Sequence, residues 1–289
     1  MTIKFFFEPN AHSARPLSLL AGMIAATAFA ASTSSYANQT VKLSVPDEMA
    51  TAPFDVPRTL DIPKGFTIRV FARVDGARFM AVAPNGDLLV SNPGAGSITL
   101  LRPRGESTPQ VFTFASRLHN PHDIVFHVLN GNSYVYIAES NRIVRARYEA
   151  NQSAIGTLET LVDDLPDASS PGLKGRYGHQ LKNITLHGDK LYVSVASTCN
   201  ACASDTKADP VRAAIYEYDA DGKNRRLYAQ GLRNAEGVRF KPGTNELWRW
   251  STTATTSFIP TIRSGTATAR TITASPCKAM STAIRPIFW

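Results

Sequence analysis

The segment Gly178–Leu186 (GHQLKNITL) decides the fold, because related segments occur at Leu118–Phe126 (LHNPHDIVF) and at Gly231–Phe240 (GLRNAEGVRF). In each of them a short polar stretch leads into an alternating apolar run, which is the pattern of a half-buried strand. A unit that returns in this way along a chain indicates a repeat architecture.

Alignment of the three segments on their strands puts His179, His119 and Arg233 at the same position of successive repeats. In a radial repeat fold, equivalent positions of successive repeats face one axis. We therefore expect an imidazole that can act as a base and a fixed cation to face one central pocket.

Four strand–turn–strand units occupy residues 80–90, 124–137, 184–193 and 238–248. Their turns are rich in Gly, Asn and Asp, a strong hairpin signal. The turn glycines recur roughly 45 to 57 residues apart, a spacing typical of propeller blades. Further apolar runs at 98–101, 142–146 and 214–218 predict outer strands. The pattern predicts an all-β chain that forms about four blades of a β-propeller; a generic β-sandwich is the alternative, against which the regular self-similarity argues.

Residues 1–37 have the features of a secretory signal peptide. Lys4 and Arg15 precede an apolar run that ends near Ala31, and Ser35–Ala37 offers a small-residue cleavage site. The run is too short to span a membrane comfortably. We therefore expect a periplasmic or secreted protein with no stable membrane insertion after cleavage.

The rest of the chain divides by composition. We expect an N-terminal linker at 38–57, a partial propeller at 58–248 and a low-complexity tail at 249–289. The net charge of +8 suggests an acidic partner, but the run from Arg249 is basic without any acidic residue. Outside that run and the signal segment, basic and acidic residues nearly balance, so nucleic acid is not an expected partner.

The character of the chain changes after Trp248, where turn signals and strand alternation end. A disordered tail is one interpretation, and a shifted reading frame is the one we favour. The shifted frame turns the Trp250–Ser251 junction into Val and can then read Asp-Gly-Asp-Gly, a loop that suits a propeller. The propeller would then be incomplete as written, with unpaired strand edges. Sequencing the gene across these codons tests this expectation.

Cys199 and Cys202 lie in a loop that follows a strand. A disulfide, a metal site and a redox-active pair are all conceivable. A metal would need two further ligands, which Cys277 alone does not supply, and no thioredoxin-like pattern surrounds the pair. We favour a structural disulfide or free thiols. Asp205 and Asp209 could bind an ion, although their spacing is not a specific metal signal.

These residues resemble those of soluble sugar dehydrogenases that depend on pyrroloquinoline quinone (PQQ), above all the L-sorbosone dehydrogenase branch, whose members are six-bladed propellers. The resemblance runs from about Pro63 to Trp248. It rests on the His179 segment, on Leu191–Asn200 (LYVSVASTCN) and on Gly231–Asn234 (GLRN). It implies PQQ and calcium as cofactors. The family's calcium ligands come from the loop after the Trp248 strand and have no match here, so no metal ligand is assigned.

The resemblance also implies roles for individual residues. His179 matches the catalytic base, and Arg233 matches the catalytic arginine that contacts the reactive carbonyl of the quinone. Asn234 matches a neighbouring cofactor contact, and His119 lies within one position of another. Imidazole exchanges protons readily near neutral pH, and guanidinium is a permanent cation with fixed donor geometry. We expect His122, His127 and His187 to be structural or surface residues.

The resemblance predicts a quinoprotein oxidoreductase that oxidises a sugar or aldose of the sorbosone or glucose type by hydride transfer to PQQ. An external quinone or cytochrome would accept the electrons. The alternatives are a non-catalytic propeller that binds a partner and a lactonase-type propeller hydrolase. We expect no appreciable dehydrogenase activity from the 289-residue chain itself. Residues 166–178 would form a long loop that could shape sugar access.

Overall fold

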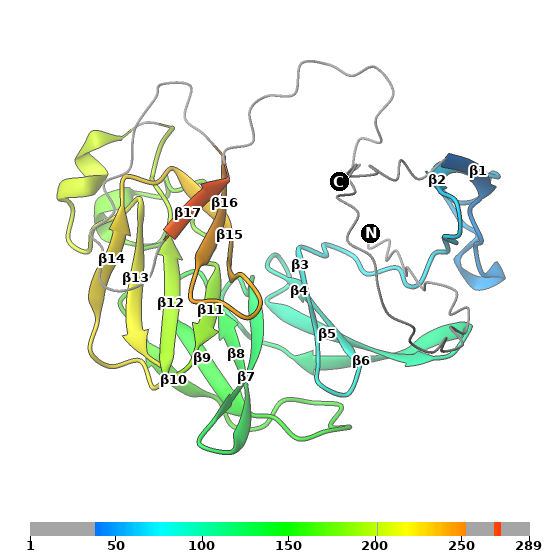
Figure 1. The fold of residues 1–289 in the computed structure, drawn as a ribbon, viewed down its shortest axis with the longest axis horizontal. Helices are drawn as coiled ribbons and strands as arrows, with labels where there is room; N and C mark the ends of the chain where they lie inside the picture. Colours follow the sequence, from blue (N-terminus) through cyan, green and yellow to red (C-terminus); the bar gives the residue numbers. More distant parts are fainter. Residues whose placement is uncertain (1–37, 201, 253–268, 273–289) are drawn as a thin grey trace, which may run out of the picture. The chain divides into compact units, whose positions relative to one another are not determined.

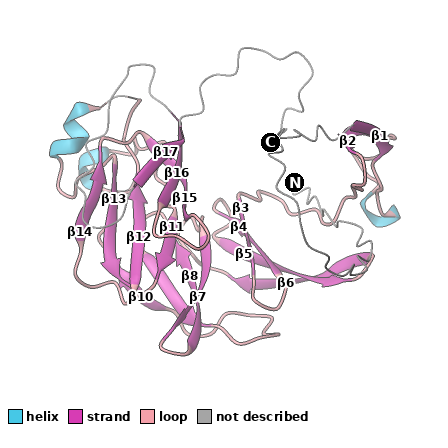
Figure 2. Ribbon diagram, in the orientation of Figure 1, coloured by secondary structure: helices cyan, strands magenta, loops and turns pink. Residues whose placement is uncertain are grey.

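A computed structural model describes residues 38–200, 202–252 and 269–272 of the chain (Figure 1). Almost all regular structure in these residues is β-strand, with three short 3-10 turns (Figure 2). No helix of the described residues is long and apolar enough to cross a membrane. The proposed signal segment and most of the predicted tail, with Cys277, lie outside the described residues.

Of the described residues, 38–73 belong to one compact unit. Its strands β1 (Asn38–Lys42) and β2 (Thr59–Pro63) pair in antiparallel fashion, with the 3-10 turn η1 (Asp47–Met49) between them. A small apolar cluster packs against them: Leu43, Phe54, Ile62, Ile68 and Val70. The stretch 38–57, which the sequence predicted as a linker, therefore contains a strand and a turn.

The second unit begins at Val74 and consists of successive sheets. The first sheet contains β3 (Phe79–Val82), β4 (Leu88–Asn92), β5 (Ser97–Arg104) and β6 (Ser107–Ala115). The second contains β7 (Ile124–Leu129), β8 (Asn132–Ala138), β9 (Ile143–Arg147) and β10 (Glu159–Val162). The third contains β11 (Ile184–His187), β12 (Lys190–Val195), β13 (Ala214–Asp219) and β14 (Arg226–Gln230). The fourth contains β15 (Asn234–Phe240), β16 (Leu247–Thr252) and β17 (Ala269–Ile272).

Each of the first three sheets is an antiparallel four-stranded meander, which is the blade of a β-propeller (Figure 1). The first strands of successive sheets lie next to one another, β3 beside β7, β7 beside β11 and β11 beside β15. The fourth sheet differs, because β17 runs parallel to β16. The prediction of an all-β propeller with about four blades is confirmed.

The apolar core lies between consecutive blades. One cluster joins the first and second sheets around Leu100 and Val135, and the next joins the second and third around Ile143 and Val193. A third cluster around Ile215 joins the third and fourth sheets. Strands inside a blade are buried on both faces, since each face packs on a neighbour; this explains their continuous apolar runs.

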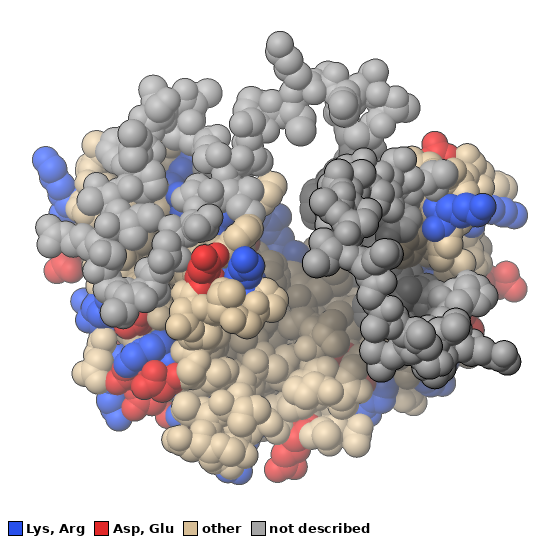
Figure 3. All heavy atoms as spheres, in the orientation of Figure 1, with Lys and Arg blue, Asp and Glu red and all other residues tan. Residues whose placement is uncertain are grey.

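The hairpins that the sequence predicted form as expected, with β3–β4, β7–β8, β11–β12 and β15–β16 paired in antiparallel register. The predicted outer strands are β5, β9 and β13. On the face of the molecule shown in Figure 3, acidic and basic side chains are interspersed among the other residues.

Candidate functional site

His179 lies in a turn just before β11, on the connection that leads from β10. Its Nδ1 atom lies 3.0 Å from the carbonyl oxygen of Ser197. A carbonyl oxygen can only accept, so Nδ1 carries the proton in this arrangement. The neutral imidazole therefore presents Nε2 as its acceptor, and Nε2 is the atom that can take a proton from a ligand.

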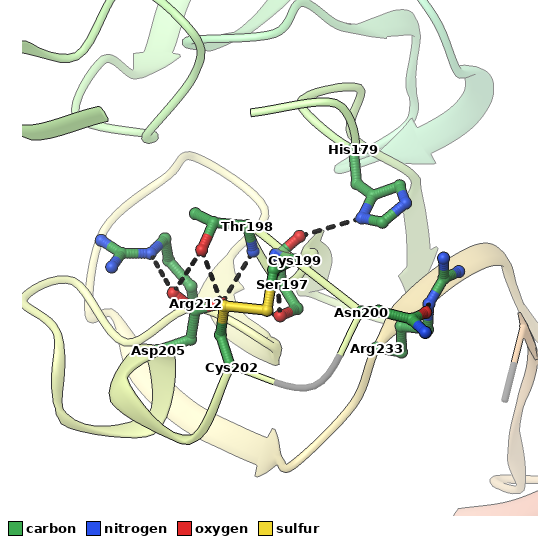
Figure 4. The surroundings of a disulfide bond; sticks show 9 residues. All are labelled: His179, Ser197, Thr198, Cys199, Asn200, Cys202, Asp205, Arg212 and Arg233. Atoms are coloured by element: carbon green, nitrogen blue, oxygen red, sulfur yellow. Dashed lines mark hydrogen bonds and ion pairs between the residues drawn. A yellow bond between two sulfur atoms is a disulfide. The ribbon is translucent and has the colours of Figure 1, made fainter. Parts of the chain in front are cut away.

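Arg233 lies in the next blade and directly precedes β15. Its carbonyl accepts a hydrogen bond of 2.7 Å from the backbone N–H of Ser197, and its Nε donates to Oδ1 of Asn200 (Figure 4). The same short segment that holds His179 therefore also holds Arg233. The structure thus attaches both residues to the segment from Ser197 to Asn200, and their convergence on one central pocket stays a prediction.

Asn234 is the first residue of β15 and is buried. Its Nδ2 donates to Oε1 of Glu236 at 2.9 Å. Its assignment as a cofactor contact remains a prediction.

His119 occupies the equivalent position before β7, but it contacts a different loop. Its Nε2 donates to Oδ2 of Asp167 at 3.0 Å, and its ring is about half exposed. His179 is bonded to Ser197 and Arg233 to Ser197 and Asn200, whereas the ring of His119 is bonded to Asp167, so the three positions differ in their partners.

Asp167 anchors the long connection between β10 and β11. Burial opposes the ionisation of its carboxyl, but hydrogen bonds from Ser169, Ser140 and His119 outweigh that effect and hold its pKa below the usual value. The backbone N–H of Ala168 in turn donates to Oε1 of Gln180, the neighbour of His179. His119 thus supports the loop that carries the candidate base.

Lys182 is a residue of this connection that the sequence did not single out. Its side chain is fully buried, and its Nζ donates to the carbonyls of Pro166, at 2.8 Å, and of Gln180. Burial lowers its pKa to about 7. A neutral amine still has two hydrogens, which matches the two carbonyls. No local pattern reveals such a site, because Pro166 and Lys182 meet only in the folded chain.

Asp205 does not act as the ion ligand that the sequence left open. Its carboxylate is fully buried and accepts from Ser197 Oγ at 2.7 Å, from the Thr198 N–H at 2.7 Å and from Arg212 Nε at 2.8 Å. Burial opposes ionisation, yet these bonds hold the pKa of Asp205 below its usual value. Its acceptor capacity is used within the protein.

Cys199 and Cys202 are joined by a disulfide, which is one of the two alternatives, a disulfide or free thiols, that the sequence favoured. Among the described residues, no three His, Cys, Asp or Glu side chains gather as a metal site. We therefore assign no ligands to calcium and derive no step through it.

A cavity of about 620 Å³ lies beside the candidate site. It is lined by the connection after β10, from Asp163 to Leu173, and by Asp209, Pro210 and Arg212. His179, Arg233 and His119 are not among its lining residues, although Asp167 is. The long loop that the sequence placed near the pocket mouth thus lines a cavity of its own.

An ion pair with a buried carboxylate ties the inner strands together. Asp123 precedes β7 and is fully buried, and it pairs with Arg239 of β15 through bonds of 2.9 and 3.0 Å. The same carboxylate accepts from the N–H of Ile184 in β11. One side chain therefore connects three blades, at the N-terminal ends of β7 and β11 and at the sixth residue of β15.

Comparisons with known proteins concern the fold. No protein family model matches the chain, and no curated protein matches it. The holo PQQ domain of pyranose dehydrogenase from Coprinopsis cinerea matches with a TM-score of 0.48 and 17% identity, over 57% of this chain and 41% of that domain. The PQQ-bound aldose sugar dehydrogenase from Streptomyces coelicolor matches with a TM-score of 0.44 and 18% identity, over 63% and 61%.

A nidogen/laminin complex also matches, with a TM-score of 0.41 and 16% identity over 63% of this chain and 60% of that one. The chain thus spans less than half of the first of these structures and about three-fifths of the other two. Likeness at these identities describes a shared fold, which hosts unrelated functions.

Proposed function

We propose that the chain carries the His179–Arg233 part of a quinoprotein active site that oxidises a sugar or aldose with PQQ, in the manner of the L-sorbosone dehydrogenase branch. The observation that supports this proposal most is that His179 and Arg233 are both hydrogen-bonded to Ser197. His179 Nδ1 donates to the carbonyl of Ser197, whose own N–H donates to the carbonyl of Arg233. A base and a permanent cation are thereby fixed at the ends of adjacent inner strands.

The donor set fits the cofactor in its chemistry. PQQ is a polyanionic ortho-quinone, and when bound it supplies the acceptor for the hydride that leaves the sugar carbon. Arg233 offers a charge that does not titrate near neutral pH and planar N–H donors suited to carbonyl and carboxylate oxygens. Asn234 and His119 are the proposed further contacts with the cofactor.

His179 would act as the general base. Its Nε2 would accept the proton of the sugar hydroxyl, or of a hydrated aldehyde, while the carbon loses a hydride; the carbon is oxidised by two electrons. The fixed proton on Nδ1 keeps Nε2 available for this transfer, and the Ser197 carbonyl stabilises the imidazolium that forms. Arg233 would stabilise the negative charge that develops on the acceptor side.

We further propose a periplasmic or secreted location, a small sugar or aldehyde as substrate, and a quinone or cytochrome as the final electron acceptor. Calcium is the metal that the resemblance implies. The near balance of charges outside the tail speaks against a nucleic-acid partner.

The test is a titration of the full 289-residue chain with PQQ, followed by quenching of protein fluorescence or by calorimetry. Removal of a hydrogen bond to a charged group costs about 1.5–3 kcal/mol, so Arg233→Ala should weaken binding by about tenfold or more. Arg104→Ala is the matched control, because this exposed arginine donates to Thr108 in another blade.

Equal affinities in the two variants, or no binding at all, would contradict the proposal. Hydrolysis of lactones by the chain would favour the lactonase alternative. A stable fold that neither binds PQQ nor hydrolyses lactones would favour the non-catalytic propeller.

A further inference from the structure

The β12–β13 loop, residues 196–213, contacts both candidate site residues at once. Ser197 accepts from His179 through its carbonyl and donates to the Arg233 carbonyl through its N–H. Asn200 accepts from Arg233 Nε. Figure 4 shows His179 and Arg233 on the same side of the segment that contains these partners.

The first part of this loop is held by Asp205. The carboxylate accepts from the side chain of Ser197 and from the N–H and hydroxyl of Thr198, and Arg212 Nε donates to it from the far end of the loop. These bonds surround the Ser197 peptide, whose carbonyl orients His179. The carboxylate is fully buried, so no solvent can replace these donors without cost.

The second part is held by the disulfide. Cys199 and Cys202 are three residues apart, with Cα atoms 5.5 Å apart. Asn200 lies inside this small ring, and the ring limits the backbone conformations available to it. Its side-chain oxygen is the acceptor for Arg233 Nε.

We propose that Asp205 and the Cys199–Cys202 disulfide are positioning residues with separate targets. Asp205 acts through the Ser197 carbonyl and selects the tautomer of His179 in which Nδ1 carries the proton. The disulfide acts through Asn200 and fixes the orientation of the Arg233 guanidinium. Their catalytic importance rests on the proposed function, whereas their hold on the two side chains does not.

The physical reason is that a side chain without a fixed hydrogen-bond partner populates several tautomers or rotamers. A neutral imidazole without a fixed acceptor populates both tautomers, and in one of them Nε2 carries the proton and cannot act as a base. An arginine without a fixed acceptor samples many rotamers, which lowers the fraction that points toward a ligand. Loss of the Asp205 carboxylate should therefore affect His179 more than Arg233, and loss of the disulfide should affect Arg233 more than His179.

The experiment is ¹⁵N NMR of the full chain with labelled histidine and arginine. In the unmodified protein, the His179 nitrogen shifts should report a proton on Nδ1, and Arg233 Nε–H should exchange slowly. Asp205→Asn should give a mixture of His179 tautomers with little change at Arg233. Asp209→Asn is the control, because this exposed carboxylate lies in the same loop without a hydrogen bond to Ser197 or Thr198.

The double variant Cys199→Ser/Cys202→Ser should speed the exchange of Arg233 Nε–H by at least tenfold and leave the His179 tautomer in place. Dithiothreitol should do the same to the unmodified protein, since it supplies the two electrons and two protons that convert the disulfide to two thiols. It should leave the double variant unchanged. This reduction keeps the disulfide half of the test valid if the double substitution prevents folding.

An unchanged His179 tautomer in folded Asp205→Asn, or unchanged Arg233 exchange after reduction, would overturn the corresponding half of the inference. The outcome is separate from that of the PQQ titration. If the NMR signals respond as expected but PQQ does not bind, the positioning role stands and the proposed function fails.

Discussion

The two ends of the inner strands β7, β11 and β15 are both tied to neighbouring blades, but in different ways. Near the N-terminal ends of β7 and β11 the link is the fully buried carboxylate of Asp123, which accepts from the N–H of Ile184 and pairs with the half-exposed Arg239 of β15. At the hairpin ends, partly exposed histidines donate to the next blade: His127 Nε2 to the Gly188 carbonyl and His187 Nε2 to Asn245 Oδ1. We infer from this contrast that one end of the inner strands carries the main stabilising contacts and the candidate site residues, whereas the hairpin end only links neighbouring blades.

The largest expected effect comes from removing the buried link. Asp123→Ala leaves the N–H of Ile184 without its carboxylate acceptor and removes the ion-pair partner of Arg239, which keeps its bonds to the Ile184 and Val238 carbonyls. Arg239 is about half exposed, so the main cost is that of a buried donor left without its acceptor, typically about 1–3 kcal/mol. We expect a loss of this size in the free energy of unfolding, measured with urea. A loss below about 1 kcal/mol would show that the two ends do not differ in this respect.

The next prediction concerns a substitution that should lower the catalytic rate with little effect on the free energy of unfolding. In the frame-restored protein, His179→Ala should lower kcat by at least ~10²-fold, the scale of general-base loss, with little change in unfolding. His127→Ala, which removes an imidazole from the opposite end, should leave kcat near that of the unmodified enzyme. An unchanged rate in His179→Ala, measured by quinone-dependent dye reduction, would remove His179 from the mechanism.

The buried side chain of Lys182, which lies just before β11, predicts that the free energy of unfolding depends on pH. Burial lowers its pKa from 10.5 in the unfolded chain to about 7 in the folded state. Between these values the unfolded chain binds more protons, so the free energy of unfolding should rise with pH, by up to about 1.4 kcal/mol per unit. Below pH 7 both states are protonated and this contribution no longer changes.

The measurement is urea unfolding at pH 7, 8 and 9 in the unmodified protein and in Lys182→Met. The variant should lack the rise that Lys182 contributes. Lys174→Met is the control, because Lys174 is an exposed lysine of the same connection. Equal slopes in all three proteins would mean that Lys182 is charged in the folded state at neutral pH.

The smallest expected effect lies at the hairpin end. His127→Ala removes a single hydrogen bond of 2.7 Å to the Gly188 carbonyl, which solvent can replace. We expect a loss of about 0.5–1 kcal/mol in the free energy of unfolding. A loss as large as that of Asp123→Ala would erase the difference between the two ends.

Much of the fold could be predicted from local patterns. Turn glycines such as Gly131 and Gly188, with positive φ, and the apolar runs beside them identify the hairpins. The repeat alignment is also correct for the strands, since Ile124, Ile184 and Val238 occupy equivalent, fully buried positions. These features depend on neighbours in sequence, which is why the sequence reveals them.

The remaining contacts depend on residues that meet only after folding. Asp205 was an unassigned carboxylate in the sequence, although it binds Ser197 and Arg212 in the structure. The pairing of Asp123 with Arg239 spans three blades, and no local signal announces it. His119 matched His179 by position, but the shared register could not show that its partner is Asp167.

The most direct test of the central claim is to follow the histidine ring nitrogens by ¹⁵N NMR while PQQ is added to the full chain. Binding near Arg233 should shift His179 Nε2 in proportion to saturation and leave His127 Nε2 unchanged. Saturable binding that shifts His127 or His187 instead, or that leaves His179 unaffected, would contradict the assignment of the site to the N-terminal ends of the inner strands.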